Sequence, residues 1–203
     1  DASEVVEIAD DPATAFKIKK DSSLTVGLNL LKAGAGDAFV SAGSTGALLA
    51  GATLLVKRIR GIRRAAMGPV IPTATGRAIL CDCGANAECT AEYLLQFAYL
   101  GNYYAKRVLG IESPRVGLLN IGAEEEKGDT LRHEAYALLT QASEAGRIRF
   151  IGNIEANDVM MGGADVVVAD GFTGNVMPKG LEGTGKFLLK ELKKVFLSSS
   201  KTK

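Results

Sequence analysis

The sequence has little of what several common kinds of chemistry need, with one histidine, three cysteines and no tryptophan in 203 residues. A Ser-His-Asp or Cys-His mechanism needs a histidine base, and His133 stands in a polar helical pattern that favours an exposed position. Cys81, Cys83 and Cys89 have no fourth cysteine and no nearby histidine beside them. Because a structural zinc site usually has four such ligands, we predict no metal centre.

The sequence also lacks the marks of a membrane-spanning, secreted or nucleic-acid-binding protein. No apolar run approaches the ~18 residues of a spanning helix, and the first residues do not resemble a secretory signal. The net charge is only +1, whereas nucleic-acid binders are usually basic. No Walker or GxGxxG motif gives direct support for a nucleotide site. We therefore expect a cytoplasmic protein with reduced thiols and no nucleic-acid partner.

What is present is an ordinary globular composition, with 47% apolar and 23% charged residues. The length predicts one domain over residues 1–203. Short apolar runs alternate with helical patterns along the chain. We predict strands at 37–42, 65–71, 77–82, 115–120, 149–151 and 165–169, and helices at 12–20, 22–34, 47–60, 91–109, 129–142 and 184–197. This alternation predicts parallel β-α-β units in a three-layer α/β/α domain.

Small polar segments follow the predicted strands, and the ligands of such sheets bind just outside the carboxyl ends of the strands. The segments are 41–47, 82–86, 120–128, 152–158 and 170–175. A fold needs turns, but it does not need every turn at one edge to be rich in Gly, Asn, Asp and Ser. We therefore predict a shared polar site. Its candidate ligand-binding residues are Ser41, Gly43, Ser44, Thr45, Gly46, Asp82, Asn86, Asn120, Glu155, Asp170 and Thr173.

Each segment also has a purely structural explanation, which the sequence alone leaves open. Segment 41–47 can bind an anion through free N–H groups, or it can be a hydroxyl-capped turn. Segment 82–86 can orient a substrate or form an Asx turn. Lys127 can be solvated among its acidic neighbours, or it can be buried and held charged, and then bind phosphate or polarise a carbonyl. The other two segments can be polar turns.

Two further features are candidates for partner binding. A basic cluster, which can be a solvated helix end or a docking patch for an acidic partner, consists of Lys57, Arg58, Arg60, Arg63 and Arg64. The predicted helix at 184–197 carries apolar residues on one side and lysines elsewhere. Most such helices pack on their own domain, but a basic amphipathic helix can also lie on an anionic bilayer.

Taken together, the segments resemble the PlsX family, the phosphate acyltransferases of bacterial phospholipid synthesis. The matching segments include VSAGSTGA at 40–47 and DGFTGNV at 170–176. The others, in the order of the family, are 19–23, 84–86, 114–122, 126–128 and 150–155. The family usually has Asn where this chain has Ser44. Since the resemblance covers the middle of the family, we expect a fragment that lacks the family's N-terminal and C-terminal segments.

The resemblance implies an isocitrate/isopropylmalate dehydrogenase-like α/β/α fold akin to phosphotransacetylase. It implies transfer of an acyl group from acyl carrier protein (ACP) to inorganic phosphate, without nicotinamide or an obligatory metal. It also implies a homodimer that associates peripherally with the cytoplasmic membrane, and an acidic partner for the basic cluster, ACP itself.

The resemblance also suggests roles for particular residues. No cysteine or serine has a base partner, so we expect phosphate to attack the thioester directly, helped by positioning and electrostatics. Lys127 would neutralise phosphate or the developing oxyanion, and Asn175 would hydrogen-bond the reacting carbonyl or phosphate. Ser41, Ser44 and Thr45 would cradle an anion. The residues that orient these groups would be Asn86, Asn120, Glu155 and Asp170.

Two other functions stay open at the level of sequence. The first is a phosphotransacetylase-like enzyme that uses acyl-CoA, with the same fold and a different thiol carrier. The second is a non-catalytic scaffold that binds ACP or the membrane through the basic cluster and the last helix. A dehydrogenase of the related fold has little support, because no dinucleotide fingerprint is visible.

Overall fold

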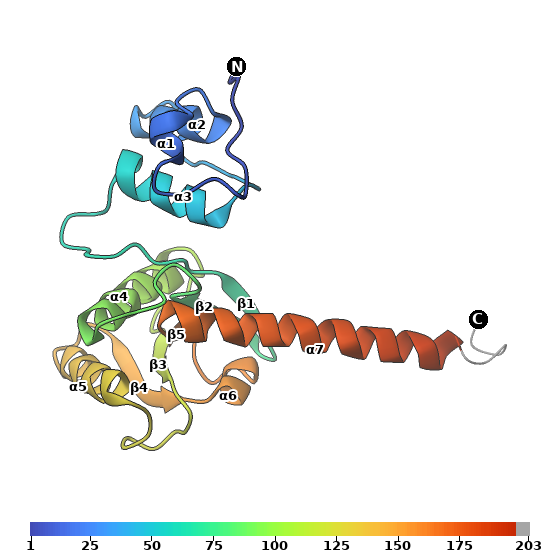
Figure 1. The fold of residues 1–203 in the computed structure, drawn as a ribbon. Coiled ribbons are helices and arrows are strands. Elements are labelled where there is room, and N and C mark those ends of the chain that lie inside the picture. The colour runs from blue at the N-terminus through green and yellow to red at the C-terminus, as the bar shows by residue number, and fades with distance from the viewer. Residues whose placement is uncertain (198–203) are drawn as a thin grey trace. The chain divides into compact units, whose positions relative to one another are not determined.

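The computed structural model describes residues 1–197, and the chain divides into two compact units, Asp1–Ala65 and Ala66–Lys203. The first unit is helical and the second contains the β-sheet (Figure 1). Compactness alone does not make an independently folding domain, so a single domain over residues 1–203 stays a prediction.

The first unit is built from α1 (Ala15–Ile18), α2 (Ser23–Lys32), α3 (Thr45–Gly51) and a short π-helix, η1 (Ala52–Val56). The Ser22 hydroxyl caps α2 by accepting a hydrogen bond from the Thr25 N–H at 3.3 Å, as an N-cap residue should. A small apolar core joins these helices and contains Phe16, Leu24, Leu28 and Ala47. The helices predicted at 12–20 and 47–60 are both present in shorter form.

The predicted strand at 37–42 is wrong. These residues adopt no regular secondary structure, and residues 1–65 contain no strand for them to pair with. Phe39 packs against the helices instead, since a Cβ added to Gly27 of α2 would lie 2.1 Å from its ring. An apolar run without a hydrogen-bonded neighbour is not stable as a strand. Segment 41–47 therefore does not follow a strand.

The second unit contains a five-stranded sheet in the order β1-β2-β5-β3-β4. Strands β2, β5, β3 and β4 are parallel, as predicted, while the edge strand β1 runs antiparallel to β2. The bounds are Val70–Thr73 for β1, Gly76–Cys81 for β2, Arg115–Leu119 for β3, Arg149–Ile154 for β4 and Val166–Val168 for β5. Strand β1 begins later than predicted, and β4 ends later.

Helices cover both faces of this sheet, which confirms the three-layer prediction for this unit. Helices α4 (Ala91–Arg107) and α5 (Thr130–Glu144) pack on one face, where Ile79 and Cys81 point. Helix α6 (Ala156–Met160) and the start of α7 (Gly171–Leu197) lie on the other face, where Ala78 and Leu80 point. Alternation of side chains along β2 thus supplies both cores, as expected of a buried parallel strand.

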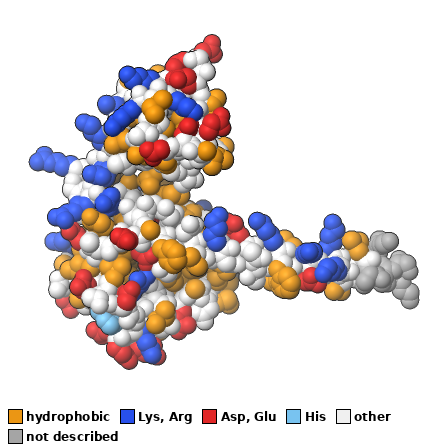
Figure 2. All heavy atoms as spheres, viewed as in Figure 1, with side chains coloured by type: hydrophobic (Ala, Val, Ile, Leu, Met, Phe, Trp, Pro, Cys, Tyr) orange, Lys and Arg blue, Asp and Glu red, His pale blue; other side chains and the backbone are white. Residues whose placement is uncertain are grey.

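Helix α7 begins much earlier than the predicted helix at 184–197. It starts at Gly171 and runs past the sheet to Leu197 (Figure 1). Its distal part leaves more than half of several apolar side chains exposed: Phe187, Leu188, Leu189, Leu192, Val195 and Phe196. Hydrophobic and basic side chains share this part of the surface (Figure 2). None of the helices within residues 1–197 is long and apolar enough to cross a membrane.

Candidate active site

The carboxyl ends of the parallel strands gather the predicted polar residues of the second unit at one edge of the sheet. Asp82 follows β2 and its N–H donates to the carbonyl of Ala169, which follows β5, at 2.9 Å. Asn120 follows β3 and its N–H donates to the carbonyl of Ile154, the last residue of β4, at 3.0 Å. The residues after β2, β3, β4 and β5 are therefore neighbours, as parallel pairing requires.

Asp82 organises the loop after β2. Its side chain is fully buried, and one carboxylate oxygen accepts hydrogen bonds from the Met67 N–H at 2.8 Å and the Cys83 N–H at 2.7 Å. The other oxygen accepts from the backbone N–H and the side-chain amide of Asn86, at 2.7 and 2.9 Å. A buried carboxylate satisfied in this way fixes the shape of the loop. A direct contact between Asp82 and substrate stays a prediction.

The start of α7 is held tightly against this loop. The Gly84 N–H donates to the Gly171 carbonyl at 3.0 Å, and the Gly171 N–H donates to the Asn86 carbonyl at 2.7 Å. A Cβ on Gly174 would lie 1.9 Å from the Asp82 carbonyl oxygen, so only glycine fits there. Asn175 is exposed, and its side chain lies 3.5 Å from where a Cβ of Gly84 would be. Backbone contact thus places Asn175 over the loop.

Asp170 caps α7 and binds Arg132 of α5. One oxygen of Asp170 accepts from the Thr173 N–H at 2.9 Å; the other accepts from the Thr173 hydroxyl at 2.7 Å and from the Arg132 guanidinium. Arg132 also donates to the Thr173 hydroxyl at 2.9 Å and pairs with Asp129 at 2.9 Å. Burial alone would raise the pKa of Asp170, but the hydrogen bonds from Thr173 and the charge of Arg132 outweigh it and lower the pKa.

The loop between β3 and α5 is closed by Asn120. Its side-chain oxygen accepts from the Ile121 N–H at 2.8 Å, and its amide donates to the Lys127 carbonyl at 3.0 Å. Gly128 follows with a φ of +98° and so close to Asn120 that a Cβ would lie 2.6 Å from its Oδ1. Glycine is required there. Asp129 then caps α5, as predicted, by accepting from the Arg132 N–H at 2.9 Å.

Lys127 is exposed, which makes the predicted alternative of a buried lysine wrong. Its aliphatic stem lies over Gly122, where a Cβ would be 2.9 Å from Lys127 Cγ. Within residues 1–197 it forms no ion pair, despite the glutamates that precede it. Its ammonium group is therefore available to an anion from outside the chain.

The remaining predicted site residues stand in helix caps and turns or at exposed positions. Glu155 is partly exposed at the N-cap position of α6. In the first unit, the Ser41 hydroxyl accepts from the Gly43 N–H at 3.1 Å and the Ser44 hydroxyl from the Ala47 N–H at 3.4 Å. These bonds form a turn and the cap of α3, the structural alternative for this segment, while Thr45 and Gly46 are exposed. Binding of substrate by Ser41, Gly43, Ser44, Thr45 or Gly46 stays a prediction.

The thiols are poorly suited to nucleophilic chemistry. Burial, helped by the charge of Asp82, raises the pKa of Cys81 to about 12. Burial also raises the pKa of Cys83 and Cys89, and a thiol is reactive only as thiolate. His133 is exposed, as predicted, and its Nε2 lies 2.9 Å from the Glu126 carbonyl oxygen. In the part of the chain that the structure describes, no group of three or more His, Cys, Asp or Glu side chains is placed to hold a metal ion.

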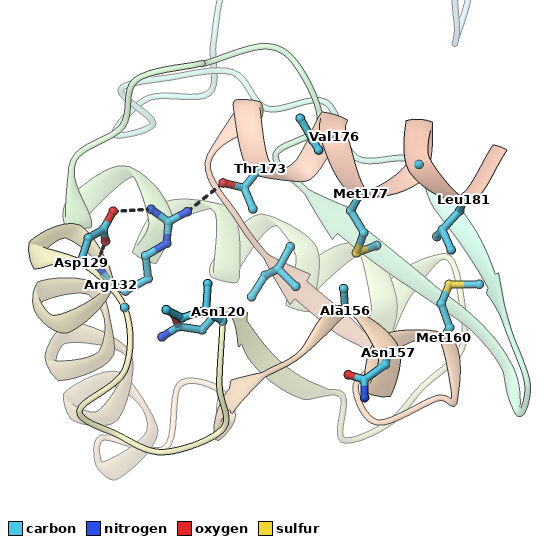
Figure 3. Close-up of a pocket in the computed structure, with 14 residues that line it drawn as sticks. Asn120, Asp129, Arg132, Ala156, Asn157, Met160, Thr173, Val176, Met177 and Leu181 are labelled. Carbon is cyan, nitrogen blue, oxygen red and sulfur yellow. Dashed lines mark hydrogen bonds and ion pairs between the residues drawn. The ribbon is translucent and has the colours of Figure 1, made fainter. Parts of the chain in front are cut away.

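The structure adds two features that the sequence did not reveal. The first is Arg132, which links α5 to the start of α7. The second is a pocket of about 840 Å³ beside it (Figure 3). The pocket is lined by Leu119, Asn120, Ile121, Gly128, Asp129, Arg132, Ala156, Asn157, Met160, Thr173, Val176, Met177, Gly180 and Leu181. The pocket could not be predicted from the sequence, because its walls come from α7 and from the end of β3, which are distant in sequence.

Solved structures that are similar to this chain include phosphotransacetylases and a branched-chain phosphotransacylase. A phosphotransacetylase from Streptococcus pyogenes matches with a TM-score of 0.66 at 21% identity, covering 85% of this chain and 57% of that chain. A branched-chain phosphotransacylase from Enterococcus faecalis matches with a TM-score of 0.55 at 18% identity, covering 86% of this chain and 65% of that one. The predicted phosphotransacetylase-like α/β fold is confirmed.

Curated relatives match along the whole chain. A phosphate acyltransferase of Lactococcus lactis subsp. lactis is 50% identical over 203 residues, which is 100% of this chain and 60% of the relative. One of Acetivibrio thermocellus is 47% identical over 202 residues, covering 100% of this chain and 58% of the relative. The chain thus spans about 60% of the length of these relatives. The model of the family described as "fatty acid synthesis protein" matches residues 1–203, and the chain belongs to that family.

Proposed function

We propose that this chain is part of a phosphate acyltransferase, which transfers a fatty acyl group from ACP to inorganic phosphate. The observation that carries the proposal is the match, at 46–50% identity along nearly the whole chain, to curated relatives that bear the name phosphate acyltransferase. The exposed, unpaired Lys127 and the exposed Asn175 at the same edge of the sheet support it.

The reaction is a single displacement at the thioester carbonyl. An oxygen of hydrogen phosphate attacks the carbonyl carbon and forms a C–O bond, and the carbonyl oxygen becomes an oxyanion. The oxyanion then collapses, the C–S bond breaks, and the phosphopantetheine sulfur leaves with the electron pair. The proton lost by hydrogen phosphate goes to that sulfur. The products are an acyl phosphate and ACP with a free thiol, so atoms and charge balance.

The chain's own residues serve this reaction by positioning and charge. Lys127 binds phosphate or the oxyanion, because an exposed ammonium group without a partner attracts an anion. Asn175 donates its amide to the reacting carbonyl or to phosphate. Asn120 fixes the backbone at Lys127, and the loop of Asp82 and Asn86 fixes the start of α7. The raised pKa values of the Cys83 and Cys89 thiols favour direct attack by phosphate over a mechanism with an acyl-cysteine intermediate.

The basic cluster is the proposed docking patch for ACP. Lys57, Arg58, Arg60, Arg63 and Arg64 are all exposed, in the segment of the first unit that follows η1. Positive charges of this kind steer an acidic partner and speed its association. Replacement of Arg58 and Arg60 by glutamate should raise KM for acyl-ACP far more than KM for phosphate, and the effect should shrink at high salt.

We propose that the distal part of α7, residues 187–197, forms the homodimer contact and binds the membrane surface. Its exposed apolar side chains include Phe187, Leu192 and Phe196, and lysines stand among them. Helices of this composition associate with each other or with anionic lipid. Light scattering measures the first property, and sedimentation with vesicles that contain phosphatidylglycerol measures the second.

The test is an acyl-transfer assay on the 203-residue chain and on the same chain with whatever its gene encodes on either side. Each protein receives palmitoyl-ACP with or without phosphate, and hydroxylamine traps acyl phosphate as the hydroxamate. We expect hydroxamate and free ACP thiol in equal amounts, both dependent on phosphate. Competition with palmitoyl-CoA decides the thiol carrier. Thiol release that ignores phosphate, or ACP binding without any release, would contradict the proposal.

A further inference from the structure

The pocket beside Arg132 has one long wall made by a single face of α7. The residues of α7 that line it are Thr173, Val176, Met177, Gly180 and Leu181. Their spacing of three and four places them on one side of the helix. The opposite wall comes from Leu119 and Ile121 around the end of β3 and from Ala156 and Met160 of α6. The pocket thus lies at the carboxyl edge of the sheet, within the second unit.

The lining is mostly polar at one end and mostly apolar at the other, where the polar Asn157 lies beside Ala156 and Met160 (Figure 3). Asn120, Asp129, Arg132 and Thr173 lie at the polar end, and Met160, Met177 and Leu181 lie toward the far end (Figure 3). The charges at the polar end are already paired, since Arg132 binds both Asp129 and Asp170. That end is therefore suited to a neutral polar group rather than to a free anion. The methionines supply a flexible apolar surface.

From this arrangement we infer that the pocket holds the aliphatic chain of the acyl substrate, with its carbonyl end toward Thr173 and its methyl end toward Met160 and Leu181. The inference rests on the proposed function, and it names the subsite for the acyl tail within it. A volume of about 840 Å³ is in the range of small-molecule pockets, which are mostly apolar with a few polar groups. The polar end is continuous with Asn120, which holds the backbone of Lys127.

The length of the pocket wall formed by α7 sets how much of an alkyl chain can lie along it. From Thr173 to Leu181 the helix rises about 12 Å at 1.5 Å per residue. An extended alkyl chain, whose C–C bonds are about 1.5 Å long, covers that distance with roughly nine or ten carbons. Gly180 lies near the far end of this wall. A side chain there would shorten the pocket and leave its polar end intact.

Gly180 can be substituted without a steric clash at the Cβ position. A Cβ added to it would meet no heavy atom within 4 Å, and the same is true of Gly185, further along α7 and outside the pocket lining. Both glycines lie within α7, so replacement by Trp or Leu improves helix propensity at either site. Gly185→Trp is therefore a matched control for Gly180→Trp.

The experiment compares the kcat/KM of palmitoyl-ACP with that of butyryl-ACP, in the chain together with whatever its gene encodes on either side. We expect Gly180→Trp to shift the ratio at least tenfold toward butyryl-ACP, with a smaller shift in the same direction for Gly180→Leu. Gly185→Trp should leave the ratio within twofold of the unsubstituted protein. Far-UV circular dichroism and urea midpoints verify that each variant is folded. A ratio that is equal in Gly180→Trp and Gly185→Trp overturns the inference.

A binding measurement separates this inference from the proposed function. Dodecyl phosphate, a non-reactive mimic of an acyl phosphate, should bind at least tenfold more weakly to Gly180→Trp than to Gly185→Trp in calorimetry. If that holds while no variant makes acyl phosphate, the pocket stands and the proposed function fails. If transfer to phosphate occurs but dodecyl phosphate binds both variants equally, the proposed function stands and the pocket inference fails. If Gly180→Trp is less stable but has an unchanged ratio of kcat/KM for palmitoyl-ACP to that for butyryl-ACP, the acyl chain binds elsewhere. That result also overturns the inference.

Discussion

Arg132 of α5 and Asp170, which stands between β5 and α7, form an ion pair across 38 residues of sequence. The side chains are only 14% and 7% exposed, and the Thr173 hydroxyl bonds to both of them. Asp170 is at the same time the N-cap of α7, and Asp129, the N-cap of α5, is the second partner of Arg132. One guanidinium therefore joins the caps of the two helices that flank the candidate active site.

Removal of Arg132 should be costly because it leaves Asp170 without its charged partner. Loss of one partner of a buried ion pair typically costs about 3–5 kcal/mol, so we expect Arg132→Met to lower the free energy of unfolding by about 3 kcal/mol in urea. In an Asp170→Asn background the same change should cost less, and this double-mutant cycle isolates the pair. Arg147→Met, at an exposed position after α5, is the control and should change stability by less than ~0.5 kcal/mol. Equal costs in both backgrounds would show that the pair contributes nothing.

The lowered pKa of Asp170 predicts a direction for the pH dependence of stability. An aspartate whose folded pKa lies below its unfolded value stabilises the fold fully above the unfolded pKa, about 3.9. That contribution is lost as pH falls through the folded pKa. The stability difference between the unsubstituted chain and Asp170→Asn should thus be constant from neutral pH to about pH 5 and shrink below about pH 4. In an Arg132→Met background the folded pKa of Asp170 should be higher, so the decline should be smaller in total and complete at a higher pH. A difference that grows as pH falls would contradict the sign.

Lys127 and Asn175 are predicted to affect transfer without affecting the fold, because both side chains are exposed. Loss of one group that stabilises an oxyanion typically costs about 10²–10³ in kcat, and we expect Lys127→Ala and Asn175→Ala to fall in that range. Their urea midpoints should match that of the unsubstituted chain. Lys106→Ala, an exposed lysine in the last turn of α4, is the control for general loss of positive charge. Near-normal turnover in both site variants would remove these residues from the mechanism.

Local sequence signals predicted the elements whose causes are local. Asp129 was predicted to cap the helix at 129–142 and does so, and the periodicity from Ala91 predicted α4 from its first residue to just past its end at Arg107. The strand predicted at 37–42 failed because apolar residues can equally pack onto helices, as Phe39 does. Periodicity indicates which side chains are buried, but it cannot say which element they are buried against.

The first half of α7 and the role of Arg132 could not be read from the sequence, for the same physical reason. Gly171, Gly174, Pro178 and Gly180 are residues of turns and helix ends by intrinsic propensity. Tertiary contacts with the loop of Asp82 outweigh that propensity, and they are invisible in a local window. Arg132 has an ordinary polar position on α5, and its partner Asp170 is distant in sequence. The polar segments of the second unit were found, since Gly, Asn and Asp at the ends of strands are a local signal, whereas segment 41–47 follows no strand.

The glycines of α7 give a final prediction, because the helix needs some of them and merely tolerates others. A Cβ at Gly174 would lie 1.9 Å from the backbone oxygen of Asp82, which cannot move without the loop, whereas a Cβ at Gly183 would meet nothing within 4 Å. Gly174→Ala should therefore destabilise the chain by about 2 kcal/mol or more through overpacking. Gly183→Ala should stabilise it by about 0.5–1 kcal/mol, because alanine is the better helix former.

Urea unfolding of both alanine variants measures this difference directly. Since the displaced loop carries the start of α7 with it, Gly174→Ala should also lower the rate of acyl transfer to phosphate, while Gly183→Ala should not. Equal and small effects at the two glycines would mean that α7 does not press on the loop of Asp82. The placement of Asn175 over Gly84, on which its proposed role in the reaction depends, would then be wrong as well.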